Sequence, residues 1–222
     1  MYKYETHMHT SEASGCASSS GAEMAEKYKE LGYTGIIVTD HFFNGNSAID
    51  RSLPWEQMVD GFCRGYENAK KRGDEIGLSV FFGWEYTFDG TDILTYGLDR
   101  QWLCSHPETM SLNIIDYIRL VKRSGGLAIQ AHPFRERDYI RMIRLFPRWI
   151  DGMETYNASD AGSMSNELAA HVARSYGLAE TSGSDSHSIN GINCGGMMFE
   201  NKLSDIDDFI SQVKSKSGVL LK

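Results

Sequence analysis

The sequence lacks the features that mark several large classes of protein. No apolar run approaches the roughly 18 residues that a membrane-spanning helix needs, and no basic segment followed by an apolar stretch opens the chain. Its 4 cysteines are scattered over 222 residues without the CxxC spacing of zinc fingers or redox motifs. We therefore expect a soluble, cytoplasmic protein without a membrane partner, whose cysteines are ordinary reduced thiols.

An excess of positive charge is also missing. The 22 Lys and Arg residues are outnumbered by 30 Asp and Glu residues, which gives a formal net charge of −8. A chain with this charge does not wrap around a polyanion through bulk electrostatics, so long nucleic acid is not an expected partner. A small phosphate held by a metal, or a short oligonucleotide, would not conflict with the charge. The sequence carries no signal for an oligomeric state.

Strand and helix signals alternate along the whole chain, without a long linker or an internal repeat. The runs GIIVTDH, LSVFFGWEY and LAIQAH are typical of buried strands, and DILTYGL is expected to return from a turn at Asp89-Gly90. Helices are expected at about 20–32, 54–71, 112–124, 138–146, 163–176 and 205–214. Repeated strand–helix units predict an α/β fold with a mostly parallel sheet that is closed, or nearly closed, as a barrel.

Side chains suited to metal binding fall at the ends of these strands. His7 and His9 are spaced i, i+2 on an extended segment, so both point to the same side. Taken alone, that pair is more typical of an unstructured terminus or a half-buried strand edge. Comparable residues lie on the other strands, Glu85 within its strand and the rest after theirs: Asp40, His41, Glu85, His132, Asp185 and His187. Parallel α/β barrels gather such strand ends on one face, so we expect these side chains to converge.

Metal chemistry accounts for the types of these residues. Neutral imidazoles and carboxylates suit Mn, Fe or Zn, and a mixed cluster with more than four ligands needs more than one ion. Metals about 3.5–4 Å apart can bridge a hydroxide, lower its pKa and hold both the entering and the leaving oxygen of a phosphoester. No cysteine nucleophile or serine triad has comparable support. We therefore expect an enzyme that uses two to three divalent metal ions to hydrolyse a phosphoester.

The ordered motifs THMHTSE, TDH, GWE, AHP and GSDSH resemble those of the PHP (polymerase and histidinol phosphatase) superfamily, which run HxH, DH, Glu, His and DxH. The resemblance extends from His7 to His187. It implies a single PHP domain over residues 1–222, folded as a distorted (β/α)7 TIM-like barrel with the metal site at the C-terminal strand ends. It also implies a ligand set: His7, His9, Glu85 and Asp185 for the first metal, His41 and His187 for the second, and His132 for a third that Glu85 bridges.

Two departures from the family pattern affect the ligand set. Ser14 stands where many relatives carry an Asp that completes the second metal, and Glu12, the only carboxylate of that loop, is our candidate in its place. The alternative is that Glu12 points into solvent. Seven residues after Glu85, where relatives often carry a histidine for the third metal, this chain has Asp92. An oxygen ligand there would favour Mn or Fe over Zn.

Catalytic roles are assigned to Asp185, His187 and Arg135. Arg135 is expected to grip phosphate oxygens from the rim of the site, because a guanidinium presents two parallel donors. The alternative is that it belongs to a solvated helix face, with the other arginines of the cluster: Arg137, Arg141, Arg144 and Arg148. Asp185, or a water on the second metal, is the candidate for moving the proton.

Other polar residues near the motifs have structural or supporting interpretations. Asp40 is expected to orient a histidine ligand rather than to bind metal. Glu154 and Asn157 lie near a strand end, where an orienting or substrate-facing role competes with a structural one. His106 and His171 are expected to be structural.

With no evident cap domain, the expected substrate is a small phosphomonoester such as a nucleotide, histidinol phosphate or a sugar phosphate. A nuclease acting on short oligonucleotides or 5′ ends is one alternative, since related PHP proteins include such activities. A non-catalytic metal-binding regulatory module is another, although both HxH and DxH are present. A metal-dependent amidohydrolase shares the barrel and the HxH opening but commonly places a lysine between its metals, and no strand end here presents one.

Overall fold

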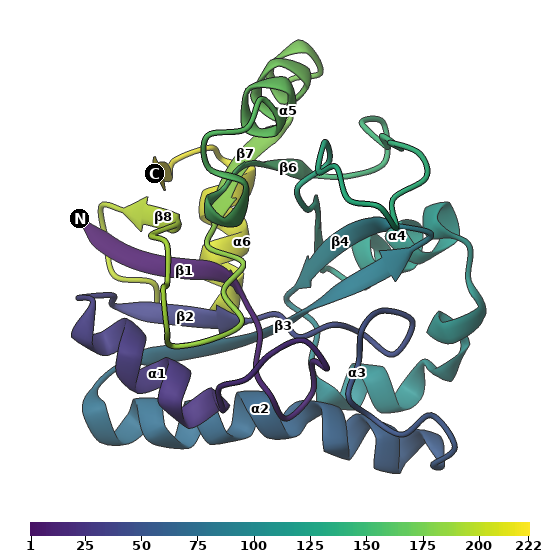
Figure 1. The fold of residues 1–222 in the computed structure, drawn as a ribbon, viewed down its shortest axis with the longest axis vertical. Coiled ribbons are helices and arrows are strands. Elements are labelled where there is room, and N and C mark those ends of the chain that lie inside the picture. Colours follow the sequence, from purple (N-terminus) through teal and green to yellow (C-terminus); the bar gives the residue numbers. More distant parts are fainter.

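A single sheet of nine strands runs through the computed structural model, which describes residues 1–222 (Figure 1). The strand order is β7-β6-β5-β4-β3-β2-β1-β8-β9. In chain order, the strands are β1 (Tyr2–Met8), β2 (Gly35–Val38), β3 (Ser79–Phe88), β4 (Thr91–Tyr96), β5 (Leu127–Gln130), β6 (Gly152–Asn157), β7 (Ala179–Gly183), β8 (Gly196–Phe199) and β9 (Val219–Leu221). All the strands expected from the sequence are present, and β9 is an addition.

The first seven strands of the chain form a nearly closed barrel. β1, β2 and β3 are mutually parallel, as are β5, β6 and β7, while β4 lies antiparallel between β3 and β5. Hydrogen bonds from Asp185 N to His7 O (2.8 Å) and from His9 N to Ser186 O (2.9 Å) join the segment after β7 to β1. The fold is therefore a distorted seven-stranded α/β barrel, as expected, with β8 and β9 continuing the sheet beyond β1.

Six α-helices surround this sheet (Figure 1): α1 (Gly21–Glu30), α2 (Trp55–Ile76), α3 (Arg100–Ser105), α4 (Ile114–Arg123), α5 (Ser165–Ser175) and α6 (Ile206–Lys214). Two short 3-10 helices, η1 (Pro107–Ser111) and η2 (Ala158–Asp160), complete the set. At the start of α1, Ser20 and Glu23 form a capping box, and α2 ends at Gly77, whose φ of 70° suits glycine. None of these helices combines the length and the hydrophobicity that crossing a bilayer requires.

Aromatic packing holds β3 against the helices. Trp84 Nε1 donates a hydrogen bond to the Tyr117 hydroxyl at 2.6 Å, and the Tyr117 ring stacks on Tyr86 with centroids 3.6 Å apart. All three side chains are buried in the largest hydrophobic cluster of the protein. Because Glu85 lies between Trp84 and Tyr86, this packing fixes the direction of its carboxylate into the barrel.

One expected helix is absent. Residues 138–146 form an irregular loop rather than a basic helix. Tertiary contacts replace the helical ones: Gln130 Nε2 donates to Arg144 O at 2.6 Å, Phe146 N donates to Gln130 Oε1 at 3.2 Å, and the Arg144 side chain pairs with Asp89. The alternative of a solvated helix face for the arginine cluster therefore does not hold, because residues 138–146 form no helix.

Candidate metal centre

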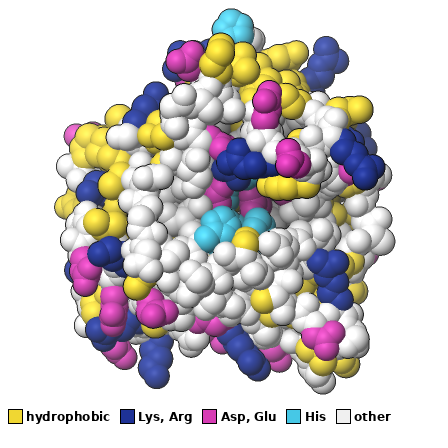
Figure 2. All heavy atoms as spheres, in the orientation of Figure 1, with side chains coloured by type: hydrophobic (Ala, Val, Ile, Leu, Met, Phe, Trp, Pro, Cys, Tyr) yellow, Lys and Arg dark blue, Asp and Glu magenta, His cyan; other side chains and the backbone are white.

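The strand ends bring the sequence-predicted ligands together in the barrel. Ligand atoms of seven side chains form three overlapping groups, within each of which they lie no more than 4.8 Å apart. The groups are His7, Glu85 and His132; His7, His9 and Asp185; and His9, His41 and His187. Figure 2 shows histidine side chains in a hollow at the middle of one face, with acidic side chains behind them and a basic one above. The expected convergence is thus present.

The distances within this cluster are those of groups that face a common point. His7 Nε2 lies 3.2 Å from His9 Nε2, and Asp185 Oδ1 lies 3.2 Å from His9 Nε2 and 3.5 Å from His7 Nε2. Glu85 is central: its Oε1 lies 3.0 Å from His132 Nε2, and its Oε2 lies 2.8 Å from His41 Nδ1. Glu85 therefore occupies the position of a carboxylate shared between sites.

Two atoms of the cluster support the presence of cations. Glu85 Oε2 and His41 Nδ1 are both buried and neither has a hydrogen-bond partner, although they lie only 2.8 Å apart. A buried polar atom without a partner is costly, so native proteins rarely retain one without a reason. A divalent cation between lone pairs would remove that cost for both atoms. The donor set of imidazole nitrogens and carboxylate oxygens fits Zn, Mn or Fe.

Outer hydrogen bonds fix the orientation of the ligands. His7 Nδ1 lies 2.9 Å from Glu154 Oε1, and Glu154 Oε2 accepts from Asn157 Nδ2 and from the backbone N–H of His132. His9 Nδ1 lies 3.2 Å from Ser14 Oγ, which donates to Asp40 Oδ1 at 2.7 Å. Such outer partners set the tautomer and direction of imidazole ligands. Asp40 and Glu154 therefore lie behind the ligands, and Glu154 does not face the cavity as a substrate contact would.

Two of the candidate ligands have strained backbones. His132 has a φ of 25° and Asp185 a φ of 55°, in the left-handed region that non-glycine residues seldom occupy. Hydrogen bonds hold both peptides in place, from His132 N to Glu154 Oε2 (3.0 Å) and from Asp185 N to His7 O (2.8 Å). Strain of this kind is retained mainly at functional sites, where the surroundings fix it.

The charges of the cluster are strongly coupled. Burial alone would lower the pKa of His7, but Glu154, Asp185 and Glu85 outweigh it and hold that pKa well above its usual range. For His9, burial and the neighbouring imidazoles of His41 and His187 hold the pKa well below its usual range. His9 is therefore neutral at physiological pH, with a lone pair ready to bind a cation.

The structure corrects the assignment of Glu12. Its carboxylate accepts hydrogen bonds from Gly21 N (3.0 Å) and from Asn68 Nδ2 (2.9 Å), and it belongs to none of the three groups. The N-terminus of α1 attracts this carboxylate because the first N–H groups of a helix have no partner within the helix. Glu12 is thus a capping residue instead of a ligand or a solvated side chain.

Asp92 and Arg135 lie at the edge of the cluster. Asp92 Oδ2 is 3.9 Å from His132 Nε2; burial and the nearby Glu85 raise the pKa of Asp92. Arg135 Nη2 lies 2.7 Å from Asp185 Oδ2, and its Nε donates to Asp160 Oδ2 at 2.7 Å. Only the third nitrogen of Arg135, Nη1, makes no contact of this kind, so most of its guanidinium is occupied in holding Asp185.

The cluster opens into a cavity of about 560 Å³ at the barrel mouth. The wall of this cavity includes six residues predicted from the sequence: His41, Asp92, His132, Arg135, Asp185 and His187. It also includes residues that were not predicted: Cys16, Asn44, Asn46 and Tyr139. Sequence reasoning missed Cys16. Burial would raise the pKa of its thiol, but the imidazoles of His187 and His41 lower it to about 6. The only feature of the sequence that could have indicated Cys16 as a cavity residue is its position in the loop after HxH, two residues beyond Ser14.

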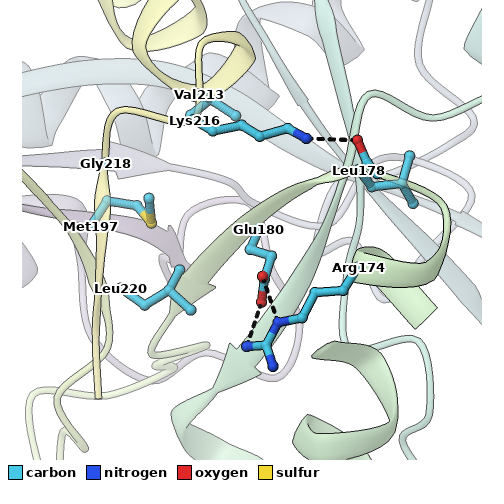
Figure 3. Close-up of a pocket in the computed structure, with 9 residues that line it drawn as sticks. Arg174, Leu178, Glu180, Met197, Val213, Lys216, Gly218 and Leu220 are labelled. Atoms are coloured by element: carbon cyan, nitrogen blue, oxygen red, sulfur yellow. Dashed lines mark hydrogen bonds and ion pairs between the residues drawn. The ribbon is translucent and has the colours of Figure 1, made fainter. Parts of the chain in front are cut away.

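A second cavity lies away from the cluster, between the end of α5, α6 and β9 (Figure 3). Its volume is about 390 Å³, and its charged side chains are already paired: Arg174 with Glu180, and Lys216 with Gly177 O. The rest of its wall is largely aliphatic, and none of the three metal-type groups borders it. We therefore place the functional site in the barrel mouth.

Comparisons with known proteins bear on the fold. A family model described as PHP-associated matches residues 163–217. A two-domain protein from Bacteroides vulgatus ATCC 8482, containing a predicted PHP-like metal-dependent phosphoesterase, superposes with a TM-score of 0.72 at 14% identity. The chain has the PHP fold. The match covers 99% of this chain and 64% of the Bacteroides protein, so the chain spans less than two thirds of that relative.

Other solved structures share this fold. PsfC from Pseudomonas syringae PB-5123 matches with a TM-score of 0.63 at 16% identity, covering 99% of this chain and 91% of that one. An amidohydrolase from Chromobacterium violaceum, with bound sulfate and no metal, matches with a TM-score of 0.58 at 13% identity, covering 99% and 98%. No curated protein sequence matches the chain.

Proposed function

We propose that residues 1–222 form one PHP domain that hydrolyses a small phosphomonoester at this metal centre. The observation that carries the proposal is the convergence of seven buried or half-buried imidazole and carboxylate side chains, in which Glu85 Oε2 and His41 Nδ1 lie 2.8 Å apart without a hydrogen bond to any group. The Bacteroides protein, described as containing a predicted PHP-like metal-dependent phosphoesterase, supports the same reaction class.

The cluster divides into ligands for two or three ions. His7, His9, Glu85 and Asp185 would hold the first, His41 and His187 the second, and His132 the third, with Glu85 as the shared carboxylate and Asp92 at the edge of the cluster. When bound, ions of Mn, Fe or Zn would supply a hydroxide nucleophile from water at neutral pH and neutralise charge that grows on the phosphoryl oxygens.

The protein's own side chains position the reaction. Asp185 turns Oδ1 towards His7 and His9 and Oδ2 towards Arg135, so both of its oxygens are engaged. Burial opposes ionisation of Asp185, but His7, His9 and Arg135 hold its pKa well below the usual range. Asp185 therefore acts as an ionised ligand, and proton transfer falls to water entering the mouth, where the His187 side chain is 31% exposed. Arg135 lines the cavity, and its Nη1, which makes no ion pair or hydrogen bond, is left to donate to a phosphoryl oxygen.

The cavity sets the size of the substrate. A volume of about 560 Å³ lies within the range of small-molecule sites, on the order of 300–1,000 Å³. One observation favours the alternative of a short oligonucleotide or a 5′ end: Tyr139 lines the cavity and is 70% exposed. Bases stack on aromatic rings of this kind without regard to sequence.

The experiment is elemental analysis of the purified chain, paired with phosphate release from a panel of small phosphomonoesters with added Mn. The proposal expects two to three metals per chain and turnover of at least one ester. His9→Ala and Asp185→Ala should lose metal and activity together while remaining folded, and His171→Ala on α5 is the matched control.

Other outcomes select among the alternatives. Metal without turnover of monoesters, but with cleavage of short oligonucleotides, would favour the nuclease. Metal without activity on either would favour the regulatory module, and hydrolysis of amides or lactones would favour an amidohydrolase. No bound metal, even after adding Mn, would overturn the proposal.

A further inference from the structure

The wall of the cavity at the barrel mouth is almost entirely polar. No Val, Leu, Ile, Met, Phe or Trp side chain lines it, and Tyr139 is its one aromatic residue apart from the histidines. Small-molecule sites are usually lined mainly by hydrophobic and aromatic side chains, with a few polar groups among them. A wall without apolar surface gains little from an apolar ligand, so the part of the substrate beyond the phosphate is expected to be polar as well.

Two neighbouring segments supply the polar residues of the wall outside the metal cluster. Asn44 and Asn46 lie in the loop after β2, and Thr87 and Asp89 lie at the end of β3 and in the turn to β4. Thr87 N donates to Asn44 Oδ1 at 3.2 Å, which joins the two segments. The side chain of Asn44 is therefore partly used within the protein, whereas that of Asn46 is not.

Hydrogen bonds fix both segments in place. Gly15 N donates to Asn46 O at 2.7 Å, so the loop after β2 is tied to the loop after HxH. In the turn after β3, Asp89 O accepts from Arg144 Nη1 at 2.7 Å, and Asp89 Oδ2 pairs with the same guanidinium. Polar groups that are already fixed lose less freedom when a ligand binds, which favours recognition by them.

Several polar atoms on these segments remain available to a ligand. The amide of Asn46 makes no side-chain hydrogen bond, and a Cβ at position 15 would lie 2.9 Å from Asn46 Oδ1, so Gly15 leaves room for that amide. Asp89 Oδ1 is free because Arg144 pairs with the other oxygen. The Tyr139 side chain is 70% exposed. The wall thus offers a free amide NH₂ beside free oxygen acceptors.

This mixture of donors and acceptors points to hydroxyl groups. A hydroxyl both donates and accepts, whereas an ionised phosphate or carboxylate only accepts and an ammonium group only donates. A nucleobase is less well served, because bases are usually held between aromatic or apolar side chains, and Tyr139 could cover only one of the two faces. The apolar C–H groups of a sugar ring need only one such face.

We propose that the substrate is the phosphate ester of a polyhydroxylated alcohol, a sugar or a related polyol, and that Asn46 and Asp89 recognise its hydroxyls while Tyr139 covers one face of its carbon skeleton. The inference rests on the proposed function, since it names the leaving group of that same reaction. It separates sugar and polyol phosphates from nucleotides and histidinol phosphate.

A panel of six esters tests the substrate class, with kcat/KM measured on the full chain loaded with Mn²⁺. Three are polyhydroxylated: glucose 6-phosphate, ribose 5-phosphate and myo-inositol 1-phosphate. The others are cyclohexylmethyl phosphate, adenosine 5′-monophosphate and histidinol phosphate. Cyclohexylmethyl phosphate matches glucose 6-phosphate in ring size and type of leaving group but has no hydroxyls. We expect the best polyhydroxylated ester to exceed each of the other three by roughly 100-fold, the product of about three hydrogen bonds worth about fivefold each.

A variant tests the role of Asn46. Asn46→Ala should reduce the preference for the best polyhydroxylated ester over cyclohexylmethyl phosphate by about fivefold, because one hydrogen bond to a hydroxyl is lost. Asn201→Ala, at an exposed position away from the cavity, is the matched control and should keep the preference of the wild type. General damage to the fold would lower the rates of both esters alike and leave their ratio unchanged. An unchanged ratio would therefore overturn the role of Asn46.

The remaining outcomes separate this inference from the proposed function. If the wild type hydrolyses cyclohexylmethyl phosphate, adenosine 5′-monophosphate or histidinol phosphate as well as the best polyhydroxylated ester, the substrate class is overturned and the phosphomonoesterase stands. If a chain with bound metal releases phosphate from none of the six esters, the proposed function is overturned, and this inference with it.

Discussion

Glu154 Oε1 lies 2.9 Å from His7 Nδ1, and both side chains are fully buried beneath the cluster. This contact turns His7 Nε2 towards Glu85 and Asp185, because the ring nitrogen that faces Glu154 carries the proton. Glu154 also accepts from His132 N, so one carboxylate orients two candidate ligands.

Replacing Glu154 with Gln should therefore weaken metal binding without unfolding the barrel. Both carboxylate oxygens of Glu154 accept hydrogen bonds, one from His7 and the other from His132 N and Asn157. The NH₂ of a glutamine would have to replace one of these oxygens and would then face a donor. This repulsion would misalign the ligands. We expect metal affinity to fall by roughly 10–100-fold, the usual effect of losing such a partner. Competition with a chromogenic chelator measures it. Glu180→Gln, at the half-exposed pair with Arg174, is the control, and equal affinities in the two variants would contradict the role of Glu154.

Arg135 should contribute to stability as well as to activity. Its guanidinium joins Asp185 and Asp160, whose side chains are 3% and 5% exposed. Removing one partner of a buried ion pair costs on the order of 3–5 kcal/mol of stability. Because Arg137 would still pair with Asp160, we expect Arg135→Gln to lower the free energy of unfolding by the smaller of these values. Urea unfolding measures the change. Arg141→Gln on the same loop should leave stability unchanged, and a stable, active Arg135→Gln would argue against this arrangement.

The pH dependence of the metal-free chain should report on Asp40. Burial raises the pKa of Asp40 from its usual 3.8 to about 6, although hydrogen bonds from Thr10 and Ser14 oppose the shift. Because the folded pKa lies above the unfolded one, its ionisation destabilises the fold. The contribution of Asp40 to the free energy of unfolding is therefore greatest below about pH 4. It falls as the pH rises through about 6, and the total loss is about 3 kcal/mol.

Asp40→Asn should reduce this loss, since the amide can accept from Thr10 N and donate to a hydroxyl. The measurement is the free energy of unfolding of both chelator-treated proteins between pH 4 and 7. Glu5, whose pKa burial raises to about 7, titrates in the same direction and is present in both proteins, so the difference between them isolates Asp40. Parallel curves for the two proteins would refute the assignment.

The sequence predicted the site better than it predicted the loops around it. The ends of parallel strands must meet at one face, and the ligands lie on or just after such strands: His7, His9, Glu85 and Asp185. Glu12 and Cys16 lie in a loop whose sequence has no periodicity from which to predict side-chain directions. The unpaired N–H groups at the start of α1 draw the Glu12 carboxylate away from the metal cluster. The helix predicted at 138–146 is absent for a related reason. The composition of this segment suits a helix, but its hydrogen bonds to Gln130 and Asp89 outweigh that local preference.

Metal should stabilise the folded chain by an amount that grows with the logarithm of its free concentration. The unfolded chain has no preformed cluster, so an ion at about 1,000 times its dissociation constant adds about 4 kcal/mol to the free energy of unfolding. We expect thermal denaturation of the stripped protein to shift upwards with increasing Zn²⁺ or Mn²⁺. Ca²⁺, which prefers six to eight oxygen ligands, should add little to a cluster made mainly of imidazoles. His9→Ala should lose most of the shift because His9 belongs to two of the three groups. An equal shift with Ca²⁺, or an undiminished one in His9→Ala, would mean that the stabilising ion binds elsewhere.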